Sequence, residues 1–166
     1  MNVELQQLSK RYGAVHALDR VSLNLGPGQI VAVIGLNGAG KTTLLRCLAG
    51  IVAPTSGMVR YDAQPFLRRD LSLRRRLLFL PDFPPMFGHM TALQHIALLL
   101  RLYERETDNL DDRIIGNLRE FDLLPLAEAR LGTLSRGQLY KVALTALLAV
   151  APELWLLDEP FASGLD

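Results

Sequence analysis

Short apolar stretches recur along the chain between turn residues, in patterns typical of strands. Residues 21–25 alternate apolar and polar side chains, which predicts a half-buried antiparallel strand, and the Gly-Pro-Gly turn at 26–28 ends it. Residues 30–34, Ile-Val-Ala-Val-Ile, form an unbroken and mainly β-branched run, which predicts a strand covered on both faces. Three further apolar runs also predict strands, at residues 58–61, 77–80 and 154–157.

Segments with helical spacing lie between these strands. Residues 42–49 predict a helix that a glycine closes. Thr91 and Gln94 have the spacing of a capping box, ahead of apolar residues at helical period. Two more helices are expected, over residues 108–121 and 135–150. Strands that alternate with helices indicate an α/β fold with a parallel sheet, and the long helical stretch indicates a subdomain inserted between two core strands.

The composition is that of an ordinary globular protein. The chain has 166 residues, 49% of them hydrophobic and 21% charged, which suits one domain or one domain with an inserted subdomain. A formal charge of +1 gives no basic field for nucleic acid, and the single cysteine, Cys47, fits a reducing compartment. The first residues do not form a signal peptide, and the longest apolar run, 142–151, is shorter than the ~20 residues of a membrane span. We therefore expect a cytosolic protein.

Residues 35–43, Gly-Leu-Asn-Gly-Ala-Gly-Lys-Thr-Thr, match the phosphate-loop pattern between a predicted buried strand and a predicted helix. Glycines let successive amides point at phosphate oxygens, and the helix start adds free N–H groups. Lys41 is expected to bridge the β and γ phosphates, and Thr42 to coordinate Mg²⁺. The alternative, a glycine-rich turn that only caps a helix, is disfavoured by this context.

Two carboxylates follow the apolar run at 154–157, where open α/β sheets bind ligands. Asp158 is placed to hold Mg²⁺ through its water shell, and Glu159 to activate the attacking water. By itself, an apolar strand that ends in Asp-Glu is a weak signal. The phosphate loop upstream makes it a strong one.

Residues 134–138, Leu-Ser-Arg-Gly-Gln, begin the last predicted helix and have two interpretations. Ser135 and Gln138 have capping-box spacing, as at many helix starts. A capped helix start with a glycine, Gly137, in its first turn is also suited to bind an anion. These residues alone do not decide between the two.

In order and spacing, these segments together resemble the nucleotide-binding domain of ABC transporters, from about Val3 to Asp166. Residues 134–138 match the family signature Leu-Ser-Gly-Gly-Gln at four of five positions, which is a highly specific marker. Residues 163–166 are similar to the family's D-loop. Tyr12 falls where the family stacks an aromatic ring on adenine, whereas on its own it would be interpreted as a packing residue.

The resemblance implies an α/β fold with a P-loop NTPase core, an N-terminal antiparallel β subdomain and an inserted α-helical subdomain. The core would comprise residues 1–82 and 152–166, and the helical subdomain residues 83–151. The catalytic residues would be Glu159, Lys41 and Asp82, and the metal ligands Thr42, Asp82 and Asp158. The residues expected to bind ATP are Tyr12, Gly35, Asn37, Gly38, Ala39, Gly40, Lys41, Thr42, Thr43, Ser135, Gly137 and Gln138.

The chain departs from the family pattern in three ways. Asp82 replaces a glutamine that senses Mg²⁺ and the attacking water, and the shorter carboxylate can still reach a metal-bound water. Arg136 replaces the first signature glycine, and we expect it to point away as a solvated side chain, with a phosphate contact as the alternative. The family's switch histidine and further core strands would lie after Asp166, so the resemblance implies a truncated domain. His16, His89 and His95 do not stand where they could replace that histidine.

The implied function is an ATPase subunit, using ATP and Mg²⁺, that drives a separate membrane permease from the cytoplasmic face. Two such domains would meet head to tail around two ATP molecules, with Ser135, Gly137 and Gln138 of one facing the phosphate loop of the other. Nucleic acid is not expected as a partner. The alternatives are a soluble ABC ATPase that acts on ribosomes or DNA, and a fragment that binds nucleotide without hydrolysing it.

Three features outside these motifs carry weaker expectations. The basic cluster of residues 68–69 and 74–76 is expected to be a solvated loop, with contact to a partner or to lipid headgroups as the alternative. Residues 83–90 would, by the same resemblance, line a groove that receives a permease helix. Cys47 is expected to be a small buried helix residue.

Overall fold

The computed structural model describes residues 1–105 and 110–160, and the chain divides into two compact units. The first unit comprises Met1–Phe79 and Glu153–Asp158. The second unit comprises Leu80–Pro152 and resumes at Glu159. Among the described residues, no helix combines the length and the hydrophobicity needed to cross a membrane.

A four-stranded antiparallel sheet forms one layer of the first unit. Its strands, in the spatial order β2-β1-β3-β4, are β1 (Val3–Tyr12), β2 (Val15–Leu25), β3 (Ser56–Tyr61) and β4 (Gln64–Pro65). The pairing of β1 shifts register between Leu5 and Leu8, where Gln7 has a φ of 48°. The bulge keeps Leu8 fully buried even though it breaks the alternation that begins at Val3 and Leu5.

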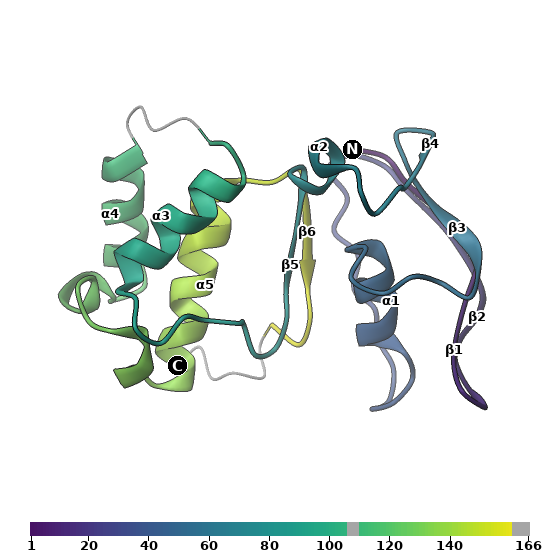
Figure 1. The fold of residues 1–166 in the computed structure, drawn as a ribbon, viewed down its shortest axis with the longest axis horizontal. Coiled ribbons are helices and arrows are strands. Elements are labelled where there is room, and N and C mark those ends of the chain that lie inside the picture. The colour runs from purple at the N-terminus through teal and green to yellow at the C-terminus, as the bar shows by residue number, and fades with distance from the viewer. Residues whose placement is uncertain (106–109, 161–166) are drawn as a thin grey trace. The chain divides into compact units, whose positions relative to one another are not determined.

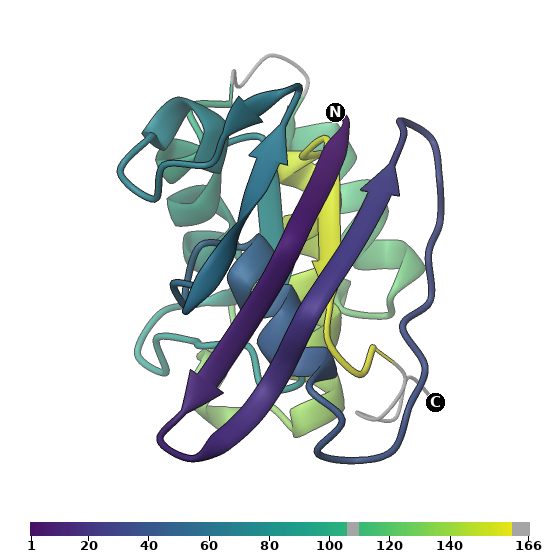
Figure 2. The ribbon, with the colours of Figure 1, turned by 90° about the vertical axis from the view of Figure 1, so that its right-hand side faces the viewer.

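Helix α1 (Lys41–Leu48) covers one face of this sheet, and β5 (Leu77–Leu80) pairs with β6 (Leu154–Leu157) on the far side of the helix (Figures 1 and 2). A short helix, α2 (Leu71–Arg74), precedes β5. The core between these layers includes Leu44, Cys47 and Leu48 of α1 and Leu156 of β6. Cys47 is thus buried as expected, and burial raises the pKa of its thiol.

In the described part of the second unit, helices and two 3₁₀ turns pack together, and α5 contacts both α3 and α4 (Figure 1). The elements are α3 (Ala92–Leu102), α4 (Leu110–Glu120), η1 (Leu124–Leu126), η2 (Leu131–Thr133) and α5 (Arg136–Val150). Thr91 and Ser135 cap α3 and α5, and each forms the predicted capping box. One face of α5 is buried, at Val142, Ala143, Ala146, Leu147 and Val150.

The predicted strands at 21–25, 58–61, 77–80 and 154–157 are confirmed, the first as the end of a longer strand. The strand predicted at residues 30–34 is wrong. That segment has no strand assignment, and Ile30 and Ile34 are 101% and 92% exposed. A strand needs hydrogen-bonded neighbours, and within the described residues β6 pairs with β5 and not with this run.

Candidate functional site

The phosphate-loop residues form the connection that enters α1 in the first unit. Gly38 and Gly40 have φ values of 83° and 95°, a region that other residues rarely adopt. Gly40 is also the N-cap of α1, and a Cβ atom there would collide with the backbone carbonyl oxygen of Ala17. The loop is therefore held against β2 at a point where only glycine fits.

Lys41 folds back over its own loop. Its Nζ donates to the carbonyl oxygens of Gly35, at 2.9 Å, and Leu36, at 3.2 Å, while the Ala39 N–H donates to the same Leu36 oxygen at 3.1 Å. The ammonium thus closes a turn whose backbone oxygens satisfy it. An anionic ligand in the loop would offer this ammonium a charged acceptor in their place.

Thr42 and Asp158 meet although they lie 116 residues apart in the sequence. The Thr42 hydroxyl donates to Asp158 Oδ1 at 3.0 Å, and Asp158 is 5% exposed at the end of β6. The contact joins the first turn of α1 to the carboxyl end of β6. Thr42 and Asp158 are two of the three predicted metal ligands, and the third, Asp82, belongs to the second unit.

Tyr12 ends β1 with its ring 46% exposed, and Lys10 Nζ lies 4.9 Å from the ring centroid. Tyr12 pairs with Val15, two residues before the Ala17 carbonyl that adjoins Gly40. The exposed ring therefore belongs to the end of the hairpin that borders the loop, and it is not a core packing residue.

Glu159 follows Asp158 directly and has a φ of 50°, in the left-handed region. A side chain other than glycine in this conformation costs free energy, and such residues concentrate at functional sites. Glu159 belongs to the second unit, with Asp82 and the start of α5, whereas the loop, Lys41, Thr42 and Asp158 belong to the first.

The start of α5 shows the capping interpretation of residues 134–138. The Ser135 hydroxyl accepts from the Gln138 N–H at 3.2 Å, and Gln138 Oε1 accepts from the Ser135 N–H at 2.8 Å. Both side chains are therefore used within the helix start, and Gly137 lies between them in its first turn.

Arg136 is about half exposed, and it is also paired with a carboxylate. Its Nη2 donates to Asp82 Oδ1 at 2.6 Å, and its guanidinium carbon lies 3.9 Å from the centroid of the Phe83 ring. Two positions at which the chain departs from the family pattern thus contact each other. The sequence does not signal this pairing, because 54 residues separate the two side chains.

Two arginines of the basic cluster form hydrogen bonds to other parts of the first unit. Arg68 donates to the carbonyl oxygens of Gly50, at 2.6 Å, and Ile51, at 2.9 Å, just after α1. Arg76 bonds two carboxylates, those of Asp62 and Glu153. Arg68 is exposed as expected and Arg76 is partly exposed, and both guanidinium groups also contact other parts of the first unit.

The D-loop residues 163–166 lie outside the described residues. Within the described ranges, no group of three or more His, Cys, Asp and Glu side chains could hold a metal ion by itself. A metal at Thr42 and Asp158 would accordingly depend on oxygen atoms from a bound ligand.

Comparison with known proteins decides the family. The sequence profile of the ABC transporter family matches residues 18–162. The chain belongs to the ABC transporter ATP-binding family. It is 38% identical to the sulfate/thiosulfate import ATP-binding protein CysA of Bordetella pertussis, over 98% of this chain and 47% of that protein. It is 34% identical to the SkfA peptide export ATP-binding protein SkfE of Bacillus subtilis, over 99% of this chain and 67% of that protein.

Among solved structures, the chain is similar to a dimeric ATP-binding cassette in a post-hydrolysis state with ADP and Pi bound. The TM-score is 0.84 at 28% identity, over 97% of this chain and 75% of the other. The ABC domain described above therefore has the P-loop NTPase fold, as predicted. It spans about half the length of the CysA proteins that it matches.

Proposed function

We propose that this ABC domain binds ATP and Mg²⁺ and couples ATP hydrolysis to transport through a separate membrane permease. One observation carries the proposal. The phosphate loop and the carboxylate at the end of β6 converge in the first unit, where Thr42 and Asp158 lie 3.0 Å apart. Relatives that are ATP-binding proteins of an importer and of an exporter support the coupling to transport.

The residues present fit Mg²⁺. A hydroxyl and a carboxylate oxygen are adjacent, and Mg²⁺ prefers such hard oxygen ligands combined with substrate phosphates and water. Thr42 and Asp158 would hold the ion, which would neutralise charge on the phosphate oxygens. The Thr42 hydroxyl, which donates to Asp158 in this structure, would then turn its lone pairs toward the ion.

Lys41 would exchange partners when nucleotide binds. Its ammonium now rests on the Gly35 and Leu36 carbonyl oxygens, and a triphosphate seated in the loop offers charged oxygens at the same place. The amides of residues 38–43, oriented by Gly38 and Gly40, would wrap the phosphates, with Asn37 and Ala39 contributing loop backbone. Tyr12 would stack on the adenine ring with its exposed face.

Glu159 is the candidate general base in this proposal. It stands one residue beyond the proposed metal ligand Asp158, and its backbone is held in a costly conformation. A carboxylate in this position would orient and deprotonate the water that attacks the γ-phosphate. The substitution Glu159→Gln keeps the shape of the side chain and removes this basicity.

The proposed function requires two partners, a second ATP-binding domain and a membrane permease. Ser135, Gly137 and Gln138 at the start of α5 would face the γ-phosphate held by the partner domain, because a capped helix start favours anions. Hydrolysis would release that contact and separate the two domains. In this proposal the domain is peripheral on the cytoplasmic face of the membrane.

The proposed site can be tested by titrating the protein with ATP in a calorimeter, once in the presence of Mg²⁺ and once in EDTA. Lys41→Ala should abolish measurable ATP binding, since it removes the charged donor of the loop. Thr42→Ala and Asp158→Asn should remove the gain in affinity that Mg²⁺ provides while leaving binding in EDTA nearly unchanged. Equal ATP affinity of Lys41→Ala and the parent would overturn the proposal.

Affinity purification tests the coupling partner. Recovery of a polytopic membrane protein with the tagged chain supports the permease. Recovery of ribosomes or DNA would support the alternative, a soluble ABC ATPase, and would overturn the transport assignment. A chain that binds ATP without turnover, alone and with its partners, would indicate a nucleotide-binding fragment.

A further inference from the structure

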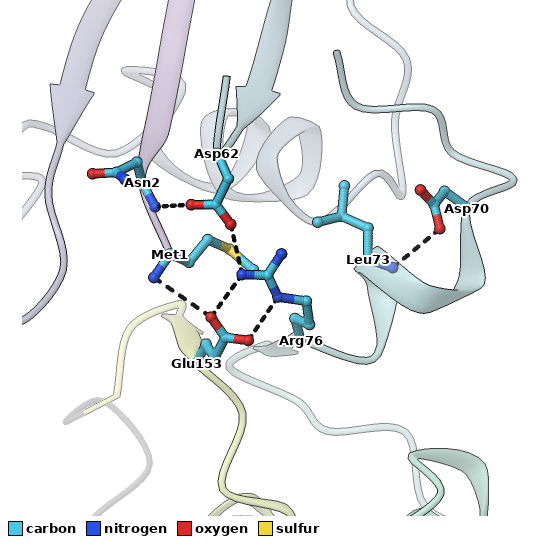
Figure 3. A network of polar contacts seen from close by, with 7 residues as sticks. All are labelled: Met1, Asn2, Asp62, Asp70, Leu73, Arg76 and Glu153. Atoms are coloured by element: carbon cyan, nitrogen blue, oxygen red, sulfur yellow. Dashed lines mark hydrogen bonds and ion pairs between the residues drawn. The ribbon is translucent and has the colours of Figure 1, made fainter. Parts of the chain in front are cut away.

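Arg76 joins four segments of the first unit through a polar network (Figure 3). Its Nε and Nη2 donate to Glu153 Oε1 and Oε2 at 2.6 and 2.8 Å, which makes a bidentate pair. Its Nη2 also donates to Asp62 Oδ2 at 2.6 Å. Asp62 in turn accepts from the Asn2 N–H at 2.7 Å, and its own N–H donates to the Asn2 carbonyl oxygen at 3.0 Å.

The network connects the antiparallel sheet to the start of β6. Asp62 follows β3 and is tied to β1 at Asn2, while Glu153 immediately precedes β6. Arg76 immediately precedes β5, and its carbonyl oxygen accepts from the Leu154 N–H at 3.1 Å. Strand β5 therefore begins directly after Arg76, and Arg76 holds the start of β6 through both its main chain and its side chain.

Strand β6 is short, and at its start the Met1 ammonium also lies 3.5 Å from Glu153 Oε2. The strand has four residues and pairs with β5 among the described strands. Leu156 is the one residue of the strand that is less than a tenth exposed. At about 3.3 Å per residue, Asp158 lies about 17 Å along the strand from Glu153. A shift at Glu153 is thus transmitted through a short, stiff segment to the carboxylate that contacts Thr42.

We infer that Arg76 is a positioning residue for Asp158: by gripping Glu153 and Asp62 it sets where β6 runs, and so where the metal-binding carboxylate meets Thr42. The inference rests on the proposed function for its metal, but the hold of Arg76 on β6 is independent of any ligand. A planar guanidinium spans both Glu153 oxygens and reaches Asp62 as well. A lysine at this position would provide charge without that fixed geometry.

The single tryptophan of the chain makes this inference testable, because Trp155 lies within β6 and is 43% exposed. Acrylamide quenching of its fluorescence, measured without nucleotide, reports the order of β6. In Arg76→Gln the quenching should increase. In the same variant the Mg²⁺-dependent gain in ATP affinity should fall about tenfold, as when an outer partner of a metal ligand is removed, while ATP affinity in EDTA stays within about twofold of the parent.

Arg68→Gln is the matched control, because Arg68 also donates to two oxygens of the first unit but at Gly50 and Ile51, away from β6. It should change neither the quenching nor the Mg²⁺-dependent gain. Glu153→Gln should reproduce Arg76→Gln, and this milder change serves if the arginine variant fails to fold. Arg76→Lys should be intermediate.

Parental quenching and parental Mg²⁺-dependent gain in both Arg76→Gln and Glu153→Gln would overturn the inference. So would equal effects in Arg68→Gln, which would mean a general loss of stability. If the parent chain bound ATP with no Mg²⁺-dependent gain, the proposed metal site would fail. The quenching comparison would then still support or refute the hold of Arg76 on β6.

Discussion

Two glycines of the phosphate loop are constrained in different ways. Gly38 has a φ of 83°, and a Cβ atom there would meet open space. Gly40 has a φ of 95°, and its Cβ atom would meet the Ala17 carbonyl oxygen. Replacing Gly38 therefore strains only the local backbone, whereas replacing Gly40 also pushes the loop away from β2.

We expect Gly38→Ala to destabilise the first unit by about 1 kcal/mol, the ordinary cost of a left-handed residue, and Gly40→Ala by about 3 kcal/mol or more. Urea unfolding followed by Trp155 fluorescence measures both. Gly116→Ala in α4 is the control, because it has open space and no positive φ, and it should stabilise the second unit by up to about 1 kcal/mol, measured by circular dichroism. Equal effects of Gly38→Ala and Gly40→Ala would contradict the role of the Ala17 contact.

His95 makes the second unit sensitive to acid. It is 4% exposed in α3, its Nδ1 has no hydrogen-bond partner, and burial lowers its pKa. Because the folded pKa lies below the unfolded value of about 6.5, unfolding takes up a proton as the pH falls below that value. The neutral imidazole therefore contributes its full stability above about pH 6.5. This contribution is lost progressively as the pH falls from that value toward the lower pKa of the folded state.

His95→Leu should flatten the dependence of the melting temperature on pH between about 7 and 5. The exposed His89 provides the control substitution, His89→Leu, which should leave the parental slope unchanged. Melting followed by circular dichroism at several pH values measures both variants. A parental slope in His95→Leu would show that another group causes the acid sensitivity.

At the scale of elements, α5 begins with a feature that is electrostatically unfavourable. Arg136 is the first residue of the helix, where the dipole disfavours a cation. Asp82, which follows β5 by two residues, supplies the compensating negative charge, and Phe83 covers the guanidinium. The pair thus links the segment after β5 to the helix start that carries Ser135 and Gly137.

The pair is partly exposed, so its coupling energy should be modest. A double-mutant cycle of Arg136→Ala and Asp82→Ala should give about 0.5–1 kcal/mol, and less in 1 M salt. The more exposed pair of Arg20 and Asp19, with a separation of 3.4 Å, is the control and should give a coupling near zero. No coupling between Arg136 and Asp82 would mean that the contact does not stabilise the fold.

At the scale of the whole molecule, the two units carry different parts of the proposed site. The first unit holds the phosphate loop with Thr42 and Asp158, and the second holds Glu159 and the start of α5. In the proposed function the start of α5 faces the phosphate loop of a second copy, and one of the similar solved structures is a dimeric cassette with ADP and Pi bound. Oligomeric state should therefore depend on nucleotide.

Glu159→Gln should shift from monomer to dimer when ATP and Mg²⁺ are added, because the bound γ-phosphate is not hydrolysed and keeps the copies together. Analytical ultracentrifugation measures the shift. The double variant Lys41→Ala/Glu159→Gln is the control and should remain monomeric with ATP. Turnover of ATP by Glu159→Gln at the parental rate would contradict its assignment as the base.

The sequence by itself determined the features whose physics is local. Thr91 and Ser135 cap helices because their partners, Gln94 and Gln138, stand three residues later. Four short apolar runs became strands where predicted, and the glycine spacing located the phosphate loop. The family signature could be recognised from the sequence because it consists of five consecutive residues, 134–138.

Tertiary structure decided whatever depended on a distant neighbour. The β-branched run at 30–34 has strand propensity but lies exposed without a pairing partner among the described strands. Strand β1 was not predicted, because the bulge at Gln7 interrupts its alternation of buried and exposed residues. The contacts of Thr42 with Asp158, Arg136 with Asp82 and Arg76 with Glu153 join residues 116, 54 and 77 positions apart. The spacing of neighbouring residues carries no information about contacts over such separations. These contacts arise only when the elements pack together.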